Sequence, residues 1–216
     1  MLIDLYYMPI SPYCRSVQLT AHSLGVELNI LHLDLLKNEH LQPEFLALNP
    51  QHTVPTFIDG DLVLWESRAI CCYLVSAYGK DDSLYPKEPK KRAFVDRMLY
   101  FEMGTLGVSF SNMLFASMAD ESYSPTSSEI DKFHKALGYL EMFLKDHKWA
   151  AGSQLTVADL VLVATISGYV KGGLSLEKYP CILKWFKQCE EEIPGYKLLN
   201  EKGAEEAGTF YKQKLP

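Results

Sequence analysis

The stretch from residue 2 to residue 33 reads LIDLYYMPISPYCRSVQLTAHSLGVELNILHL. It begins with a short apolar run, as expected of a buried strand. Ser11 and Pro12 are residue types that favour a helix N-cap and the first helical position, and Gly25 marks the end of that helix. Residues 27–33 then alternate like a second strand. A strand, a helix and a strand in this order predict a parallel pair joined by a right-handed crossover.

The next segment continues this alternation as far as residue 79. A short helix is expected over 43–48, and the strands 56–58 and 62–64 flank Asp59-Gly60, a typical hairpin turn. A further helix follows over 66–78 and ends at Gly79. The predicted order of elements is therefore βαβ, then α, then ββα.

Beyond this point the strand pattern disappears. Residues 81–89 are polar and rich in proline, which indicates a connector between domains. Helical periodicity follows over 90–118, 128–145, 160–170 and from Pro180 to Cys189, with a capping box, Thr156-x-x-Asp159, ahead of the third helix. We therefore predict an α/β domain over 1–80, a linker over 81–89 and an all-helical domain over 90–216.

Composition limits the function further. The chain has 216 residues, roughly one and a half domains at about 150 residues each. With 48% apolar and 22% charged residues it is neither disordered nor collagen-like. No apolar run is long enough to span a membrane, and the first residues do not resemble a secretory signal. Five cysteines without Cys-x-x-Cys spacing argue against a disulfide scaffold or zinc module, so we expect a cytoplasmic protein.

The charge distribution excludes polyanionic partners. The net charge is −6, and residues 1–80 alone hold four basic and eight acidic residues. We therefore expect no binding to nucleic acid or to a membrane surface. Four of the six histidines lie in the same acidic stretch. If this half binds an anion, a few well-placed groups must hold it.

Three local features could carry chemistry, whereas we find no phosphate loop and no pattern of metal ligands, so no metal is expected. The first is Ser11 at the helix N-terminus, where free N–H groups favour an anion. The second is Val54-Pro55. Because proline lacks an N–H, the strand that follows should start at this point or lie on a sheet edge. A cis bond would expose the Val54 backbone to an extended peptide. The third is Glu66-Ser67-Arg68, suited to the charged head of an amino acid. Taken singly, each is an ordinary helix cap or turn; together they would hold a small peptide-like thiol.

These three motifs occur in this order, and the segments that contain or follow them extend along nearly the whole chain. The segments are Asn49–Pro55, Leu64–Ile70, Tyr85-Pro86, Tyr100–Leu106 and Leu155–Asp159. The chain thereby resembles cytosolic glutathione transferases with a thioredoxin-like first domain, above all the insect delta type with an active-site serine. The resemblance implies an enzyme that conjugates glutathione, its co-substrate, to hydrophobic electrophiles.

The resemblance also implies roles for individual residues. Ser11 would donate a hydrogen bond to the glutathione thiolate, and the Val54 backbone, before a cis Pro55, would pair with the cysteinyl unit. The remaining glutathione contacts would come from His40, His52, Glu66, Ser67 and Arg68. The electrophile pocket is expected to include Pro12, Leu35, Phe110, Met113, Phe115, Met118 and Phe210. A homodimer is implied, with an apolar patch drawn from Cys71, Tyr73, Phe94 and Phe101.

Two departures from the delta pattern keep other hypotheses open. Ser-Pro-Tyr-Cys differs from Ser-x-Pro-Cys-Arg and is similar to the glutaredoxin motif with serine for its first cysteine, so a thiol–disulfide oxidoreductase using Cys14 is one alternative. A non-catalytic ligand-binding protein of this fold is another. Gly107 stands where relatives often carry an aromatic residue, so the electrophile cannot be inferred. Tyr6 and Tyr7 are rival thiolate donors.

Overall fold

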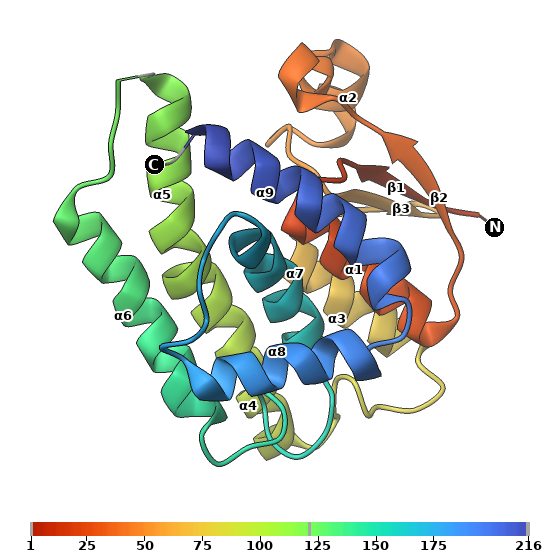
Figure 1. The fold of residues 1–216 in the computed structure, drawn as a ribbon. Helices are drawn as coiled ribbons and strands as arrows, with labels where there is room; N and C mark the ends of the chain where they lie inside the picture. The colour runs from red at the N-terminus through yellow and green to blue at the C-terminus, as the bar shows by residue number, and fades with distance from the viewer. Residues whose placement is uncertain (1, 121, 215–216) are drawn as a thin grey trace.

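The computed structural model describes residues 2–120 and 122–214 and is drawn in Figure 1. The sheet has the strand order β2-β1-β3-β4. Its strands are β1 (Ile3–Tyr7), β2 (Leu28–His32), β3 (Thr56–Asp59) and β4 (Leu62–Trp65). The parallel pairing of β1 with β2 is confirmed, with Leu5 opposite Ile30, and β3 and β4 form the predicted antiparallel hairpin.

The helices of this half are α1 (Pro12–Leu24), α2 (Pro43–Leu48) and α3 (Ser67–Tyr78), with 3₁₀ turns at Leu35–Lys37 and Glu39–Leu41. Both predicted ends of α1 are confirmed. The Ser11 hydroxyl accepts a hydrogen bond from the Cys14 amide, and Gly25, at φ 71°, donates to the carbonyls of the last turn. Only glycine adopts such a φ freely, which explains why the helix ends there. In Figure 1, α1 and α3 lie on the side of the sheet that faces the helical half.

Of the two positions expected for β3, a start directly after Pro55 is confirmed and a sheet edge is wrong. The Val54–Pro55 peptide is cis, as predicted, and β3 begins directly after it. The strand is not on an edge, however, because it lies between β1 and β4. Since Pro55 precedes the strand, its missing N–H removes no hydrogen bond from the sheet, so a central position is compatible with the sequence.

The second half is helical, as predicted. Its helices are α4 (Pro89–Phe101), α5 (Val108–Ala119), α6 (Ser127–Leu144), α7 (Val157–Lys171), α8 (Pro180–Glu192) and α9 (Lys202–Lys214). A π-helical turn at Glu102–Gly107 joins α4 to α5, so the expected long helix is present but wider in its middle. A second π-helical turn, Lys197–Glu201, leads into α9. No helix within the described residues combines the length and hydropathy needed to cross a bilayer.

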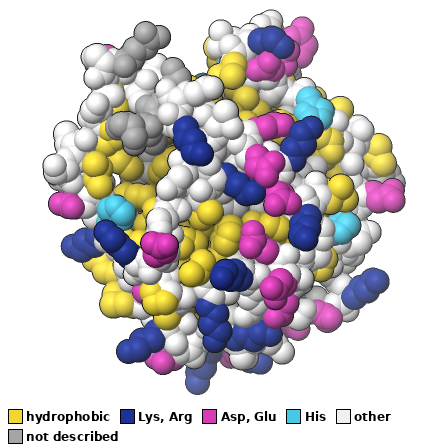
Figure 2. Space-filling view, in the orientation of Figure 1, with side chains coloured by type: hydrophobic (Ala, Val, Ile, Leu, Met, Phe, Trp, Pro, Cys, Tyr) yellow, Lys and Arg dark blue, Asp and Glu magenta, His cyan; other side chains and the backbone are white. Residues whose placement is uncertain are grey.

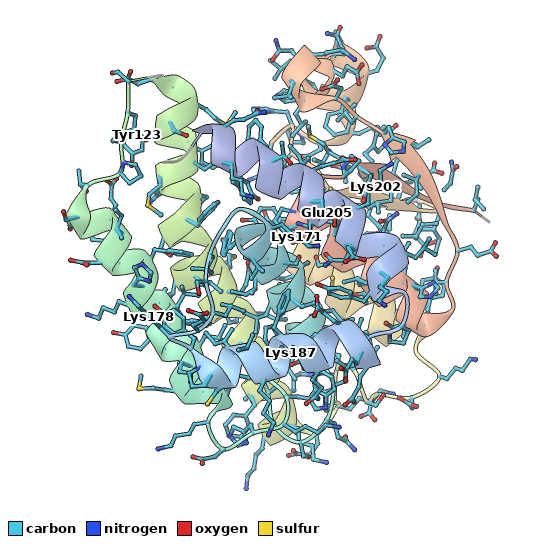
Figure 3. The ribbon with its side chains drawn as sticks, in the orientation of Figure 1. Tyr123, Lys171, Lys178, Lys187, Lys202 and Glu205 are labelled. Carbon is cyan, nitrogen blue, oxygen red and sulfur yellow. The ribbon has the colours of Figure 1, made fainter. Side chains whose placement is uncertain are left out.

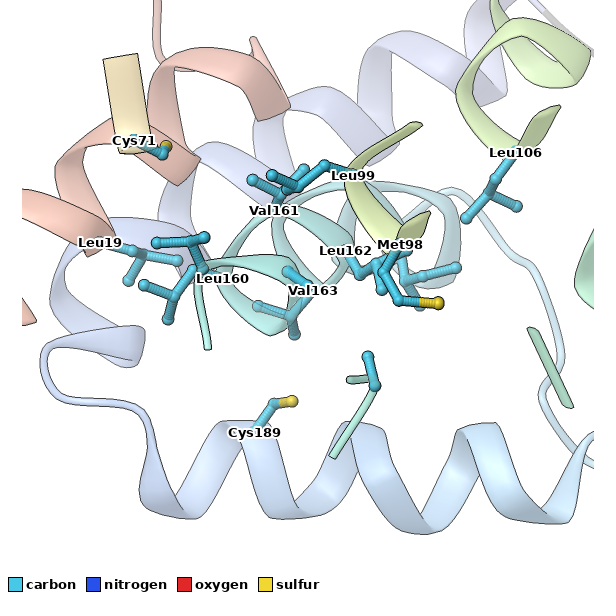
Figure 4. Close-up of a cluster of buried hydrophobic side chains, with 14 of the residues drawn as sticks. Leu19, Cys71, Met98, Leu99, Leu106, Leu160, Val161, Leu162, Val163 and Cys189 are labelled. Carbon is cyan, nitrogen blue, oxygen red and sulfur yellow. The ribbon is translucent and has the colours of Figure 1, made fainter. Parts of the chain in front are cut away.

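Helix α7 is the centre of the core. Every side chain from Val157 to Tyr169 is buried, which explains why its sequence is apolar on all sides. Figure 4 shows its Leu160 and Val163 between side chains of α1, α4 and α8, including Leu19, Met98 and Cys189. Both halves therefore contribute to one hydrophobic cluster.

Helix α9 closes the molecule on the outside of α7. Lys171 at the end of α7 forms ion pairs with Glu205, at 3.0 Å, and with Glu201, at 3.5 Å. Figure 3 shows Lys171 and Glu205 side by side. Charged side chains of both signs cover this outer face in Figure 2. The polar outer side of α9 explains why the sequence pattern alone does not delimit this helix.

Candidate active site between the two halves

A cavity of about 430 Å³ lies between the α/β half and the helical half. This volume is typical of a small-molecule site. Its wall from the α/β half consists of Met8, Ile10, Ser11, Pro12, Tyr13, Leu35, Leu36, Thr53, Val54, Pro55, Glu66, Ser67 and Arg68. Its wall from the helical half consists of Met103, Gly107, Val108, Phe110, Ser111, Leu114, Phe115, Met118, Tyr169, Phe210 and Tyr211.

Ser11 lies on this wall at the N-terminus of α1. Its oxygen accepts a hydrogen bond from the Cys14 amide over 3.3 Å. This bond uses a lone pair, so the hydroxyl proton remains free to donate. Pro12 has no N–H, and the Tyr13 amide has no acceptor among the described residues. The turn therefore offers a hydroxyl donor and a free amide in the positive field of a helix terminus.

The other candidate catalytic groups near Ser11 do not reach the cavity. Cys14 is completely buried, and burial raises the pKa of its thiol to about 11. A protonated thiol without access to solvent cannot initiate disulfide exchange, which removes the basis for the oxidoreductase alternative. Tyr6 packs edge-on against Phe45, and Tyr7 is buried with its pKa raised to about 12 by desolvation. Neither tyrosine lines the cavity.

The residues before β3 bring a free backbone segment to the cavity. Val54 and Pro55 both line it, and the bond between them is cis. Within the described part of the chain, neither the amide nor the carbonyl of Val54 makes a backbone hydrogen bond. These groups can pair with an extended peptide, as strand addition requires.

The segment before α3 contributes a strained residue and a buried ion pair. Glu66 has φ 71°, a sparsely populated conformation for a residue with a side chain, at the N-cap of α3. Ser67 follows and is almost fully buried. Arg68 lines the cavity, but its guanidinium binds the buried Glu102, with Nε 2.9 Å from Oε2. Thr165 of α7 donates to the other Glu102 oxygen over 2.8 Å.

The two histidines expected near the site lie side by side. The ring centroids of His40 and His52 are 5.7 Å apart. Burial and the neighbouring His52 lower the pKa of His40. Among the described atoms, His40 Nδ1 is buried and has no hydrogen-bond partner. Neither imidazole lines the cavity itself, but His52 directly precedes Thr53, which does.

The helical wall contains most of the residues expected for an electrophile pocket. Phe110, Phe115, Met118 and Phe210 line the cavity, as do Pro12 and Leu35 from the α/β half. Met113 was expected there as well, but that expectation is wrong: its side chain is buried in the core.

Sequence reasoning missed other cavity residues, above all Met103, Leu114, Tyr13, Tyr169 and Tyr211. The spacing of positions 103, 107, 110, 114 and 118 follows one helical face, so periodicity could have found the first two. The three tyrosines come from distant helices, and only the fold brings them together. Within residues 2–120 and 122–214, no cluster of three or more His, Cys, Asp or Glu side chains is arranged as a metal site.

Comparison with known proteins decides the family. Residues 5–84 match the model of the glutathione S-transferase N-terminal domain, and residues 113–192 match that of the C-terminal domain. Glutathione S-transferase D7 of Anopheles gambiae is 43% identical over 213 residues, covering 98% of this chain and 97% of that protein. The chain belongs to the glutathione S-transferase family.

Solved structures of insect transferases are similar to this chain over nearly its whole length. A delta-class glutathione transferase of Nilaparvata lugens is 46% identical, covers 97% of this chain and 98% of its own, and superimposes with a TM-score of 0.92. A Drosophila mojavensis homologue solved with bound glutathione is 38% identical, covers 99% and 98% of the two chains, and has a TM-score of 0.90. The resemblance to the delta type and the thioredoxin-like fold of the first half are thereby confirmed, and the chain is a glutathione transferase rather than a non-catalytic module.

Proposed function

We propose that Ser11 stabilises the thiolate of bound glutathione, which then attacks an apolar electrophile held by the helical wall. The observation that carries the proposal is the free hydroxyl proton of Ser11 at the cavity surface, directly before the first turn of α1. A second favourable group is the unpaired Tyr13 amide.

The interactions at Ser11 can supply the free energy needed to stabilise a thiolate. A free thiol ionises near pH 8.5, and lowering its pKa by about two units needs about 2.7 kcal/mol of preference for the thiolate. A hydrogen bond to a charged acceptor contributes about 1.5–3 kcal/mol, and a helix N-terminus about 0.3–1 kcal/mol. Together these contributions are sufficient, so the reaction requires neither a general base nor a metal ion.

The rest of glutathione would extend along the α/β wall. The free backbone of Val54, before the cis Pro55, pairs with the cysteinyl unit. Glu66 and Ser67 bind the γ-glutamyl end, and Arg68 supports that end from its ion pair with Glu102. His40 and His52, whose rings lie side by side, approach the glycyl carboxylate.

The electrophile would occupy the apolar part of the same cavity. Phe110, Phe115, Met118 and Phe210 face Pro12 and Leu35 across it. Such a surface favours hydrophobic compounds, including foreign ones, so a role in detoxification follows. The five cysteines are free thiols, as expected of a protein that functions in the reducing cytoplasm.

We further propose that the transferase is a homodimer. Phe94 is 49% exposed, and the half-buried Tyr73 and Phe101 are the other expected patch residues with accessible surface. Cys71, the fourth, is fully buried, so its inclusion in a surface patch was wrong. A large exposed aromatic side chain of this kind is characteristic of protein interfaces.

The test is steady-state conjugation of glutathione to benzyl chloride by Ser11→Ala and Ser11→Gly. Both variants lack the donor, and glycine retains most of the N-capping preference, so stability and donation are separated. We expect kcat to fall about tenfold or more while the KM for glutathione changes little. Tyr6→Phe and Tyr7→Phe serve as controls and should retain activity. Unchanged turnover in both Ser11 variants at pH 7 would exclude the donor role.

A further inference from the structure

Asn49, at the C-terminal end of α2, is completely buried and has no role in the function proposed above. The loop that follows it runs to the start of β3 and carries His52 and Val54, two residues proposed to hold glutathione. Burying a side-chain amide costs free energy unless its donors and its acceptor are all used. The partners of this amide therefore show what it holds in place.

Every polar atom of the Asn49 side chain is bonded within the loop. Its Oδ1 accepts a hydrogen bond from the Gln51 amide over 2.9 Å. Its Nδ2 lies 2.9 Å from Thr56 Oγ1 and 3.2 Å from both the carbonyl oxygen and the hydroxyl oxygen of Thr53. One amide proton thus goes to Thr56 and the other is shared by the two Thr53 oxygens. A single side chain connects the beginning, the middle and the end of the loop.

Further hydrogen bonds anchor both ends of the loop. The backbone amide of Asn49 donates to the Phe45 carbonyl in α2 over 2.9 Å, and the Asn49 carbonyl accepts from the His52 amide at the same distance. At the other end, the Thr56 hydroxyl donates to the Thr53 carbonyl over 2.9 Å. Phe45 and Thr56 are themselves buried, so the loop is attached to rigid parts of the α/β half.

The loop contains a backbone conformation that its surroundings must maintain. His52 has φ 47°, in the left-handed region that residues with a side chain rarely adopt. The bonds from Asn49 to Gln51 and to Thr53 lie on either side of His52 in the chain. They hold the backbone in the conformation that places the His52 ring centroid 5.7 Å from that of His40.

The same bonds leave the next residue open to a ligand. The Thr53 carbonyl receives hydrogen bonds from both Asn49 and Thr56. By contrast, the amide and carbonyl of Val54 make no backbone hydrogen bond among the described residues, and Val54 lines the cavity. The loop is ordered before a ligand arrives, so binding loses no affinity to ordering it.

We propose that Asn49 is a positioning residue for glutathione, because its side chain holds the loop in the shape that presents the Val54 backbone and the His52 imidazole. The inference rests on the placement of glutathione in the proposed function. Asn49 does not line the cavity and therefore acts through the loop. Ser11 stands on a different element, so stabilisation of the thiolate does not depend on Asn49. Loss of the amide should weaken glutathione binding and leave turnover of the bound complex intact.

The first test is steady-state conjugation of glutathione to benzyl chloride by Asn49→Ala and Asn49→Asp. Aspartate has the shape of asparagine and can still accept from Gln51, but its carboxylate cannot donate to Thr53 or Thr56. In both variants we expect the KM for glutathione to rise about tenfold and kcat to stay within about twofold of wild type. Asn29→Ala is the matched control. Its amide donates to Asp4 over 2.8 Å between β1 and β2, away from the loop, and its loss should leave KM unchanged.

Thr56 provides a second pair of variants that does not alter Asn49. Thr56→Val removes the hydroxyl with little change in volume and should raise the KM for glutathione about threefold to tenfold. Thr56→Ser keeps the hydroxyl and should recover most of the wild-type KM. If Thr56 contributed only by packing, serine would be the more harmful of the two changes, because it leaves a gap in a buried site.

Calorimetry with S-methylglutathione, which cannot react, should show the same losses of affinity without turnover. Wild-type affinity in folded Asn49→Ala, or a fall in kcat at unchanged KM, would overturn the inference. Thermal unfolding identifies any Asn49 variant that does not fold, and the Thr56 pair then decides: equal KM in the valine and serine variants would also overturn it. If the wild-type protein does not bind S-methylglutathione, the proposed function fails first and the inference fails with it.

Discussion

Glu102 is fully buried and connects three parts of the molecule. It binds Arg68 of the α/β half and accepts a hydrogen bond from Thr165 of α7. Arg68 itself is mostly enclosed, with 14% of its side chain exposed. Removing one partner of such a pair leaves a charge with little solvent and no counter-ion.

We therefore expect Glu102→Ala to lower the free energy of unfolding by about 3–5 kcal/mol in urea titrations. Replacing both partners, as in Arg68→Met with Glu102→Leu, should recover much of this loss, because no isolated charge remains. Thr165→Val alone should cost only about 1 kcal/mol. If the double variant is no more stable than Glu102→Ala, an isolated Arg68 charge is not the cause of the lost stability.

His40 gives a prediction about pH. Its pKa is lowered by burial and by His52, so the imidazole is neutral at pH 7 in the free protein. A bound carboxylate favours the protonated form, and binding therefore strengthens as the pH falls from neutral into the acidic range. By calorimetry, S-methylglutathione should bind about threefold to tenfold more tightly at pH 5.5 than at pH 7.5.

The ligand has no titratable thiol, so this pH dependence reports on the protein and the carboxylate. The double variant His40→Gln, His52→Gln should lose it, and His147→Gln, an exposed histidine of the helical half, should retain it. A wild-type affinity that is flat over this range would exclude the histidines from the carboxylate site.

Part of this residue-level picture could be predicted from the sequence. Ser11, Val54 and Glu66 were recognised because each stands at a helix or strand terminus whose local signals are strong. The pairing of Arg68 with Glu102 was not predicted, because the two residues are 34 positions apart and periodicity carries no information about such contacts. The same holds for the convergence of Tyr13, Tyr169 and Tyr211.

At the scale of elements, close packing positions α9. A Cβ added to Gly208 would lie 2.4 Å from the Lys171 carbonyl carbon and 2.6 Å from its oxygen. These are backbone atoms, so the helix itself would have to move. Two and three positions later, Phe210 and Tyr211 form part of the cavity wall.

Gly208→Ala should therefore lower the free energy of unfolding by about 1–3 kcal/mol and raise the KM for the electrophile. The matched control is Gly138→Ala in the middle of α6, where an added Cβ has no neighbour within 4 Å. That change should stabilise the protein by about 0.5–1 kcal/mol because alanine favours the helix. Equal effects of the two changes in thermal melts would show that α9 is not tightly packed.

Elements with clear capping signals were predicted closely, and those held by tertiary contacts were not. The α1 boundaries follow from Ser11, Pro12 and Gly25. Helix α9 is stabilised mainly by its contacts with α7, which leave little trace in its own polar sequence. The π-helical turn at Glu102–Gly107 was likewise not predicted; its first residue, Glu102, is bound by residues of other elements.

For the whole molecule, the proposed dimer can be tested at Phe94. Arg97 lies over the rings of Phe94 and Phe143, at 5.0 and 5.3 Å, which holds the exposed Phe94 in place on α4. Phe94→Glu would bury a charge in an apolar interface, and we expect sedimentation to show a monomer where the wild type is a dimer. A wild-type monomer at micromolar concentration would contradict the dimer itself, and a dimeric variant would exclude this patch.

The sequence predicted two unlike halves, and the structure adds that they share one core. Arg15 of α1 is fully buried and donates to Ser167 of α7 over 3.0 Å and to Asn200. The boundary predicted near residue 80 therefore separates two kinds of architecture that share one core. The cavity lies where the halves meet, as expected for small-molecule sites.

The central claim is that Ser11 stabilises a thiolate, and the pKa of the thiol of bound glutathione tests it most directly. It can be followed by the ultraviolet absorbance of the thiolate as pH is raised, with the enzyme in excess. We predict a pKa about two units below the 8.5 of a free thiol in the wild type, and a rise of about one unit or more in Ser11→Gly. An unshifted pKa in the wild type, or the same lowered pKa in the variant, would contradict the account.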